Sequence, residues 1–255
     1  MRTIGADSPQ GIPSSLNTVD IFMSHEGLLL EYEQSLTRHL PSPTDPKGER
    51  KWYNTGAHFL WIGDRTRQPD GAHVEYMRGI ENPIGVKVGP TTKPEDLPEL
   101  LNRIDPKKEI GKITLITRYG AGNVEKYLPA HIEAVKESGH VVVWVCDPMH
   151  GNAKVAPSGV RTRHFADIIT ELSKTLRIHK DNGRKLNGVH FELTGDRVTE
   201  CIGGSMELSD EDLSTNYQTY CDPRLNYEQS LDVAFLIAKY YANEREDMER
   251  NVFRL

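Results

Sequence analysis

The chain has 255 residues, and its 37 acidic and 31 basic side chains give a formal net charge of −6. This balance provides no positive field for nucleic acid, and no apolar run reaches the roughly 20 residues of a membrane-spanning helix. The three cysteines form no CxxC motif, and residues 1–10 contain no apolar signal core. We therefore expect a cytoplasmic protein with no nucleic-acid or membrane partner.

The chain divides into an arm and one domain. Residues 1–17 predict an extended N-terminal arm, and residues 18–255 predict a single domain. Residues 41–51 contain three prolines, which remove backbone donors, so we expect a loop there with neither helix nor strand. Short apolar runs predict strands at residues 19–23, 58–62, 85–88, 112–117, 140–145 and 188–193. Apolar residues at three- and four-residue spacing predict helices at residues 28–36, 94–103, 121–138, 163–178 and 228–243.

Alternation of strands and helices indicates an α/β fold with a parallel sheet, which is either doubly wound or a barrel. Each predicted strand ends in polar, chemically capable residues. In a doubly wound sheet only the strands at the switch point contribute to the site, whereas in a (β/α) barrel every strand end does. The pattern therefore favours a barrel, although a closed barrel needs eight strands and the sequence predicts six.

Three residues at successive positions carry metal-binding side chains: His150, Glu192 and Asp222. An imidazole with two carboxylates is a mixed N/O set that suits Mn²⁺, Fe²⁺, Co²⁺ or Zn²⁺. Singly, each has a structural alternative: a histidine satisfied within a turn, a solvent-facing strand end, and a cap or turn residue before a proline. The three residues predict a metal site only as a set, because barrel strand ends indicate function collectively.

Four cations form a second set: Arg65, Arg67, Lys87 and Arg118. Lys87 lies inside an apolar run, where a charge is costly without a partner. A ligand phosphate or carboxylate would be that partner, and the alternative is an ion pair with Asp64 or Glu192. Convergence of two or three of these cations predicts a doubly anionic substrate, such as a phosphorylated acid. For Arg67 a solvated surface position is an equal alternative.

Glu26, Trp61 and Asp64 complete the predicted mouth of the barrel. An acid at this place could orient a water or balance the cations, and the alternative for Asp64 is a structural ion pair with Arg65 or Arg118. Cys146 lies in an apolar strand with no base nearby in sequence, so we expect it in the core.

Six motifs carry a resemblance to a known family. They are SHEGLLLEYEQSLTR (24–38), HFLWIGDRTRQPDGAHVEYMRGIENPIGVKVGP (58–90), ITRYGAGNVEKYLPAHIEAV (116–135), VVWVCDPMHGN (142–152), GVHFELTGDRVTECIGG (188–204) and YCDPRLNYEQSL (220–231). Over roughly residues 18–245 the chain resembles the class II 3-deoxy-D-arabino-heptulosonate 7-phosphate (DAHP) synthases.

The resemblance implies a (β/α)8 TIM barrel and the first step of the shikimate pathway, in which phosphoenolpyruvate condenses with erythrose 4-phosphate and phosphate is released. It implies a divalent metal, Mn²⁺ before Co²⁺ or Fe²⁺, and we expect a homo-oligomer. The implied metal ligands are His150, Glu192 and Asp222; the implied substrate-binding residues are Trp61, Asp64, Arg65, Lys87 and Arg118; the implied catalytic residues are Glu26, Asp64 and Lys87.

The chain also departs from the family pattern. The first two barrel strands, a cysteine that is the remaining metal ligand and further basic residues have no match in residues 1–18, so we expect about six βα units, strands three to eight. We predict a DAHP synthase. One alternative is a non-catalytic truncated homologue that binds or regulates a full-length synthase. Another is a different metal-dependent aldol enzyme that keeps the phosphoenolpyruvate half-site.

Overall fold

A parallel sheet of six strands organises the structure, a computed structural model that describes residues 20–42 and 44–252, with side chains through residue 246. In spatial order the strands are β1 (Ser24–Glu26), β4 (Phe59–Ile62), β5 (Ile84–Val88), β6 (Ile113–Thr117), β7 (Val143–Cys146) and β10 (Gly188–Val189). Each neighbouring pair is parallel, so all carboxyl ends meet at one edge.

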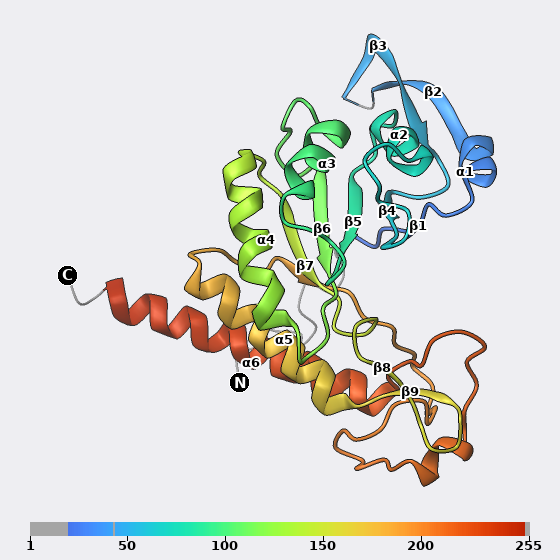
Figure 1. The fold of residues 1–255 in the computed structure, drawn as a ribbon, viewed down its shortest axis with the longest axis vertical. Helices are drawn as coiled ribbons and strands as arrows, with labels where there is room; N and C mark the ends of the chain where they lie inside the picture. The colour runs from blue at the N-terminus through green and yellow to red at the C-terminus, as the bar shows by residue number, and fades with distance from the viewer. Residues whose placement is uncertain (1–19, 43, 253–255) are drawn as a thin grey trace, which may run out of the picture.

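The sheet is strongly curled. Three strands lie between β4 and β10, so a flat sheet would separate their side chains by about 19 Å at the usual strand spacing. The rings of Trp61, on β4, and His190, which follows β10, nevertheless lie only 5.2 Å apart between centroids. The sheet therefore forms a half-barrel with β1 and β10 at its two edges (Figure 1). This confirms the α/β class and the curled parallel sheet.

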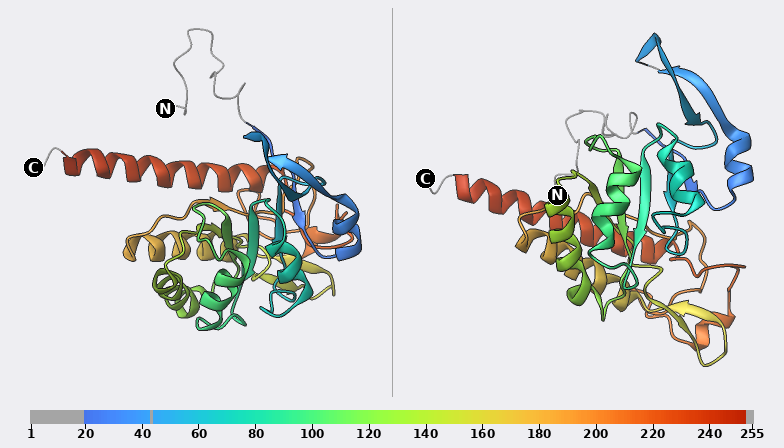
Figure 2. Two further views of the ribbon diagram at one scale, coloured as in Figure 1. Left: turned by 90° about the horizontal axis from the view of Figure 1, so that it is seen from above. Right: turned by 45° about the horizontal axis from the view of Figure 1, so that its top comes forward.

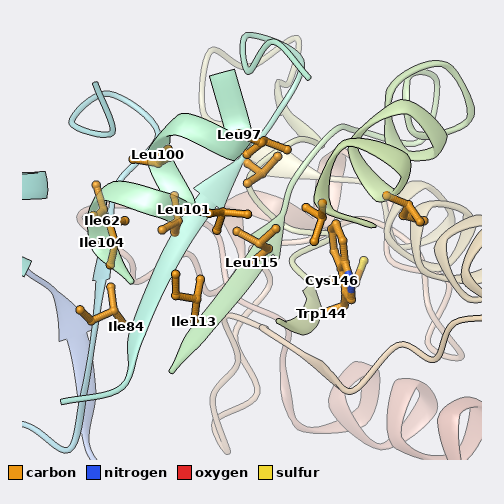
Figure 3. Close-up of a cluster of buried hydrophobic side chains, with 14 of the residues drawn as sticks. Ile62, Ile84, Leu97, Leu100, Leu101, Ile104, Ile113, Leu115, Trp144 and Cys146 are labelled. Carbon is orange, nitrogen blue, oxygen red and sulfur yellow. The ribbon is translucent and has the colours of Figure 1, made fainter. Parts of the chain in front are cut away.

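The helices α2 (Ala72–Arg78), α3 (Asp96–Ile104), α4 (Val124–Ser138) and α5 (Phe165–Asp181) cover the outer face of the sheet. The apolar spacing of α3 buries Leu97 and Leu101 against Ile113 and Leu115 of the sheet (Figure 3). Cys146 is fully buried in the same core, as predicted. Helix α2 was not predicted from the sequence.

Two antiparallel hairpins interrupt the alternation. β2 (Thr37–Ser42) pairs with β3 (Asp45–Asn54), so the prediction of a loop at residues 41–51 was wrong. A two-stranded ribbon consists only of edges, and Pro41 can therefore sit opposite Arg50 without breaking a buried ladder. The second hairpin, β8 (Ala153–Val155) with β9 (Arg161–Arg163), follows β7 and was not predicted.

Three other elements lie within the described residues: α1 (Leu30–Leu36), the short 3₁₀ helix η2 (Glu211–Ser214) and α6 (Tyr227–Val252). Figure 2 shows α6 as a long helix that runs past the sheet. No helix among the described residues is long and apolar enough to cross a membrane. The predicted arm at residues 1–17 lies outside the described residues.

Two strand predictions had wrong bounds. Residues 20–23 are not a strand, because β1 begins at Ser24, whose partner on β4 is Phe59. The last strand ends at Val189 rather than at residue 193, and Leu193 makes only an isolated bridge to Leu225. That bridge brings the segment before Leu225 beside the end of β10.

Candidate metal and anion site

A pocket of about 400 Å³ opens at the carboxyl ends of the parallel strands. Its lining comes from both halves of the sheet and from the hairpin β8–β9. The lining residues are Glu26, Trp61, Gly63, Asp64, Arg65, Lys87, Arg118, His150, Arg161 and Asp222. Except for Gly63 and Arg161, all of them are residues that the sequence analysis selected. The carboxyl edge of a parallel sheet is where such sites form, because side chains of successive strands converge there.

Lys87 is the buried cation of this pocket, with 5% of its surface exposed. Its ammonium group pairs with the carboxylate of Asp147, which is fully buried after β7, and lies 5.7 Å from the centre of the Trp61 ring. The predicted structural partners were Asp64 or Glu192, so that prediction was wrong. The sheet brings the end of β7 level with the end of β5 across one intervening strand, a proximity that sequence spacing does not reveal.

The Asp147 carboxylate also holds His150, with 2.7 Å between its Oδ2 and the histidine Nδ1. Burial would raise the pKa of Asp147, but His150 and Lys87 hold it well below its ordinary value. Burial alone would lower the pKa of His150, yet the hydrogen bonds to Asp147 and Glu192 raise it to about 9. The nearby His190 is different: burial and the Lys87 charge lower its pKa to about 4. Lys87, Asp147 and His150 therefore form a cluster of paired charges, and His190 lies beside it as a neutral imidazole.

The predicted metal set converges. One ligand atom from each of His150, Glu192 and Asp222 lies within 4.8 Å of the other two. His150 turns its Nε2 toward Glu192 Oε1 at 3.3 Å, while its Nδ1 is held by Asp147. A carboxylate on the far nitrogen of a histidine is the usual way to orient that histidine toward a metal.

The donor set fits a divalent cation. Glu192 Oε2 and Asp222 Oδ1 are buried and accept no hydrogen bond from the described residues, although each lies within ion-pair distance of an arginine. Buried carboxylate oxygens normally find a well-aligned donor, so oxygens that lack one have lone pairs left for a cation. One imidazole with two carboxylates is a mixed N/O set that suits a divalent transition metal.

The opposite wall of the pocket is built around Asp64. Its two carboxylate oxygens pair with Arg67 Nη1 at 2.7 Å and Arg118 Nη1 at 3.2 Å. Arg118 also donates to the His150 carbonyl oxygen, which ties this wall to the metal set. Arg67 is largely buried and bonds to Thr91 rather than standing on a solvated surface. It faces a neighbouring cavity, whereas Arg65 lines the main pocket.

The loops after β6 and β7 touch each other closely. A Cβ on Gly151 would lie 2.4 Å from the backbone nitrogen of Gly120, so this approach requires glycine. Beneath the contact, Glu171 of α5 accepts hydrogen bonds from Tyr119 N and Asn152 Nδ2, each at 2.7 Å. Glu171 thus fixes together the two loops that carry Arg118 and His150.

Sequence reasoning missed Asp147, His190, Arg161 and Arg163. Asp147 could have been found from its spacing, because it precedes His150 by three residues in a strand-end turn. The two arginines gave no signal, since their segment has no apolar pattern. Arg161 Nη2 lies 2.8 Å from Asp222 Oδ1, and Arg163 Nη1 lies 2.5 Å from Glu192 Oε2.

A half-barrel whose strand ends gather buried cations and a histidine–carboxylate set defines a (β/α)-type protein with a combined anion and metal site. The family model described as the Class-II DAHP synthetase family matches residues 1–238, and the chain belongs to this family.

Three relatives, each named phospho-2-dehydro-3-deoxyheptonate aldolase, agree with this membership. The Neurospora crassa protein is 56% identical over 261 aligned positions, which cover 98% of this chain and 53% of the relative. The Mycolicibacterium smegmatis protein is 50% identical, covering 88% of this chain and 48% of the relative. The Streptomyces coelicolor protein is 46% identical, covering 96% and 52%. The chain thus spans about half the length of these relatives.

Proposed function

We propose that this chain carries the site of 3-deoxy-7-phosphoheptulonate synthase, which condenses phosphoenolpyruvate with erythrose 4-phosphate and releases phosphate. The observation that supports it best is one pocket that Lys87, Arg118 and Arg65 line together with His150 and Asp222. Glu192 completes the metal set with these last two residues. Phosphoenolpyruvate carries two anionic groups, a carboxylate and a phosphate, which need cations held in position. The aldehyde acceptor needs an electrophilic activator.

In this proposal Lys87 and Arg118 hold the phosphoenolpyruvate carboxylate and phosphate, with Arg65 as a further phosphate contact. Ion pairs with Asp147 and Asp64 hold the Lys87 and Arg118 side chains in position before the substrate arrives. His150, Glu192 and Asp222 would hold a divalent metal, with Mn²⁺ the first candidate. The bound metal would supply a Lewis acid to polarise the sugar aldehyde. C3 of phosphoenolpyruvate then bonds to the aldehyde carbon, water adds at C2, and the C2–O bond to phosphate breaks.

We further propose that the six strands correspond to strands three to eight of an eight-stranded barrel and that residues 18–255 form one domain. The two edge strands, β1 and β10, and the half-length match to the relatives support this assignment. Homo-oligomer formation and a cytoplasmic location stay predictions.

The test follows phosphoenolpyruvate consumption by the purified chain with Mn²⁺, with and without erythrose 4-phosphate. We expect consumption that depends on the sugar phosphate, and we expect Lys87→Met to lower it by about 100-fold or more. Lys154→Met is the matched control, because Lys154 pairs with Asp167 on the surface, and it should stay within about twofold.

If the purified chain is folded but inactive, it is then mixed with a separate polypeptide that covers the remaining half of the Neurospora crassa relative. Activity that appears only in the mixture supports the site and assigns the missing strands to the second polypeptide. No activity in either format contradicts the proposal and favours a non-catalytic binding partner.

A further inference from the structure

Asp222 lies on a loop that has no regular secondary structure, residues 215–226, between η2 and α6. The backbone of this loop is paired near its two ends, where Thr199 N donates to the Asn216 carbonyl and Leu225 bridges Leu193. The residues around Asp222 must therefore be held by side chains from outside the loop. Two buried charged side chains provide these contacts, Arg163 from β9 and Glu200 from the segment after β10. Figure 1 shows β8–β9 beside the segment that contains η2.

Glu200 is completely buried, and its carboxylate binds the backbone of the loop. It accepts backbone hydrogen bonds from Gln218, Thr219 and Arg224 at 3.2, 2.9 and 2.8 Å. The Arg224 side chain adds two more, at 3.0 and 2.7 Å. All five donors belong to residues that flank Asp222. Burial would raise the pKa of Glu200, but these hydrogen bonds hold it below its ordinary value.

Arg163 is also fully buried, and it is the largest such side chain in the described chain. Its Nη1 donates to the carbonyl oxygen of Pro223, directly after Asp222, and pairs with Glu192 Oε2 at 2.5 Å. Its Nη2 lies 3.9 Å from Asp222 Oδ1. A single guanidinium therefore contacts both carboxylates of the metal set and the backbone of the loop.

The two charged residues are linked to each other. The Arg163 carbonyl accepts from Ile202 N at 2.8 Å, and the Thr162 hydroxyl donates to the Glu200 carbonyl at 2.9 Å. Strand β9 and residues 200–202 thus form one rigid support, and the loop of Asp222 is fastened to it from two directions.

We propose that Arg163 and Glu200 are positioning residues for the metal set, which they hold in shape without binding the metal themselves. This inference rests on the metal set of the proposed function, but its test needs no turnover. For Arg163, charge and position predict opposite signs. Removing this cation relieves its Coulomb repulsion of Mn²⁺ and should by charge alone tighten Mn²⁺ binding, whereas losing the support should weaken it.

The experiment measures the dissociation constant of Mn²⁺ by calorimetric titration at a temperature where circular dichroism shows each variant folded. We expect Arg163→Met to weaken Mn²⁺ binding by at least about tenfold and Glu200→Gln by a smaller factor. Arg163→Lys keeps the charge but offers one ammonium in place of a fork, so its effect should be intermediate. The lysine variant also carries the test if Arg163→Met does not fold.

Arg161→Met is the matched control. Arg161 contacts the same Asp222 carboxylate at 2.8 Å, but its side chain is 53% exposed and it does not reach the loop backbone or Glu192. We expect a change below about threefold, or tighter binding. Unchanged or tighter Mn²⁺ binding in both Arg163 variants overturns this inference and leaves the proposed function standing. Absence of Mn²⁺ binding in every protein, the unsubstituted chain included, contradicts both the inference and the metal set of the proposed function.

Discussion

The two hairpins are anchored alike but used differently. At the base of β2–β3, Asn54 Nδ2 donates to the buried Glu33 at 2.7 Å. At the base of β8–β9, Asn152 Nδ2 donates to the buried Glu171, also at 2.7 Å. Beyond the base they diverge: β2–β3 leaves Trp52 half exposed, whereas β9 buries Thr162 and Arg163 completely or nearly so.

This difference shows how a short insertion becomes part of a site. The β8–β9 hairpin follows the strand that delivers Asp147 and His150, so its return strand passes the ends of β10 and the Asp222 loop. The β2–β3 hairpin leaves the sheet between β1 and β4 and contacts α1 through Glu33, α2 through Tyr76 and the segment after α2 through Asn82. Proximity to the convergent strand ends, rather than hairpin structure, determines which insertion carries chemistry.

The largest expected effect comes from replacing one histidine near each hairpin and comparing the two losses of Mn²⁺ affinity. His150→Ala removes the imidazole of the metal set and should weaken Mn²⁺ binding by more than about 100-fold, measured by titration. His25→Ala removes the histidine that bonds to Glu33 at 2.8 Å, and it should leave Mn²⁺ affinity within about twofold. Equal effects of the two substitutions would show that the metal set is wrongly assigned.

A second substitution tests whether the base of β2–β3 is purely structural. Glu33→Ala removes one of the two acceptors of the buried Asn54 amide and the hydrogen-bond partner of His25, so the free energy of unfolding in urea should fall by about 2–3 kcal/mol. Glu31→Ala, on the exposed side of the same helix, should change it by less than about 0.5 kcal/mol. A substantial loss of Mn²⁺ affinity in Glu33→Ala would break the proposed separation between the two hairpins.

The base of β8–β9 should respond to pH. Burial raises the pKa of the Glu171 carboxyl from 4.5 to about 7, so the folded chain holds this proton more tightly than the unfolded chain. Stability from this group is therefore present at low pH and is lost as the pH rises from about 4.5 to 7.

Glu171→Gln cannot ionise, so between pH 4.5 and 8 the variant should gain about 3 kcal/mol of unfolding free energy relative to the unsubstituted chain. Chemical denaturation at several pH values measures this difference. Glu133→Gln, on the exposed face of α4, is the control and should show a flat difference. A flat difference for Glu171→Gln as well would contradict the raised pKa.

The smallest effect is expected at the exposed part of β2–β3. Trp52 stacks on His39 with 4.7 Å between ring centroids, yet 52% of its surface is exposed. Trp52→Ser should lower the free energy of unfolding by less than about 1 kcal/mol. Val155→Ser, on the exposed strand β8, should cost a similar amount. A loss above about 2 kcal/mol for Trp52→Ser would indicate that the hairpin packs against something further.

The strand and helix predictions succeeded where burial is two-sided. β5 and β6 are fully buried apolar runs, and α3 shows a strong helical pattern, so local composition and tertiary environment agree. They failed at residues 41–51, because the prolines, among them Pro41 and Pro46, favoured a loop although two exposed strands pair there. They also failed at β8–β9, because these strands have no apolar alternation. In both places the strand depends on a partner segment rather than on its own residues.

The sequence by itself determined which side chains could be gathered, because alternating strands and helices put every strand end on one edge and each end carries a reactive group. Only the tertiary structure decided the pairs within that edge. Curling of the sheet joined Lys87 to Asp147 rather than to Asp64 or Glu192, and a patternless hairpin carried Arg163 to two carboxylates. Partner choice among buried charges follows from distances across strands, and these distances exist only once the sheet has curled.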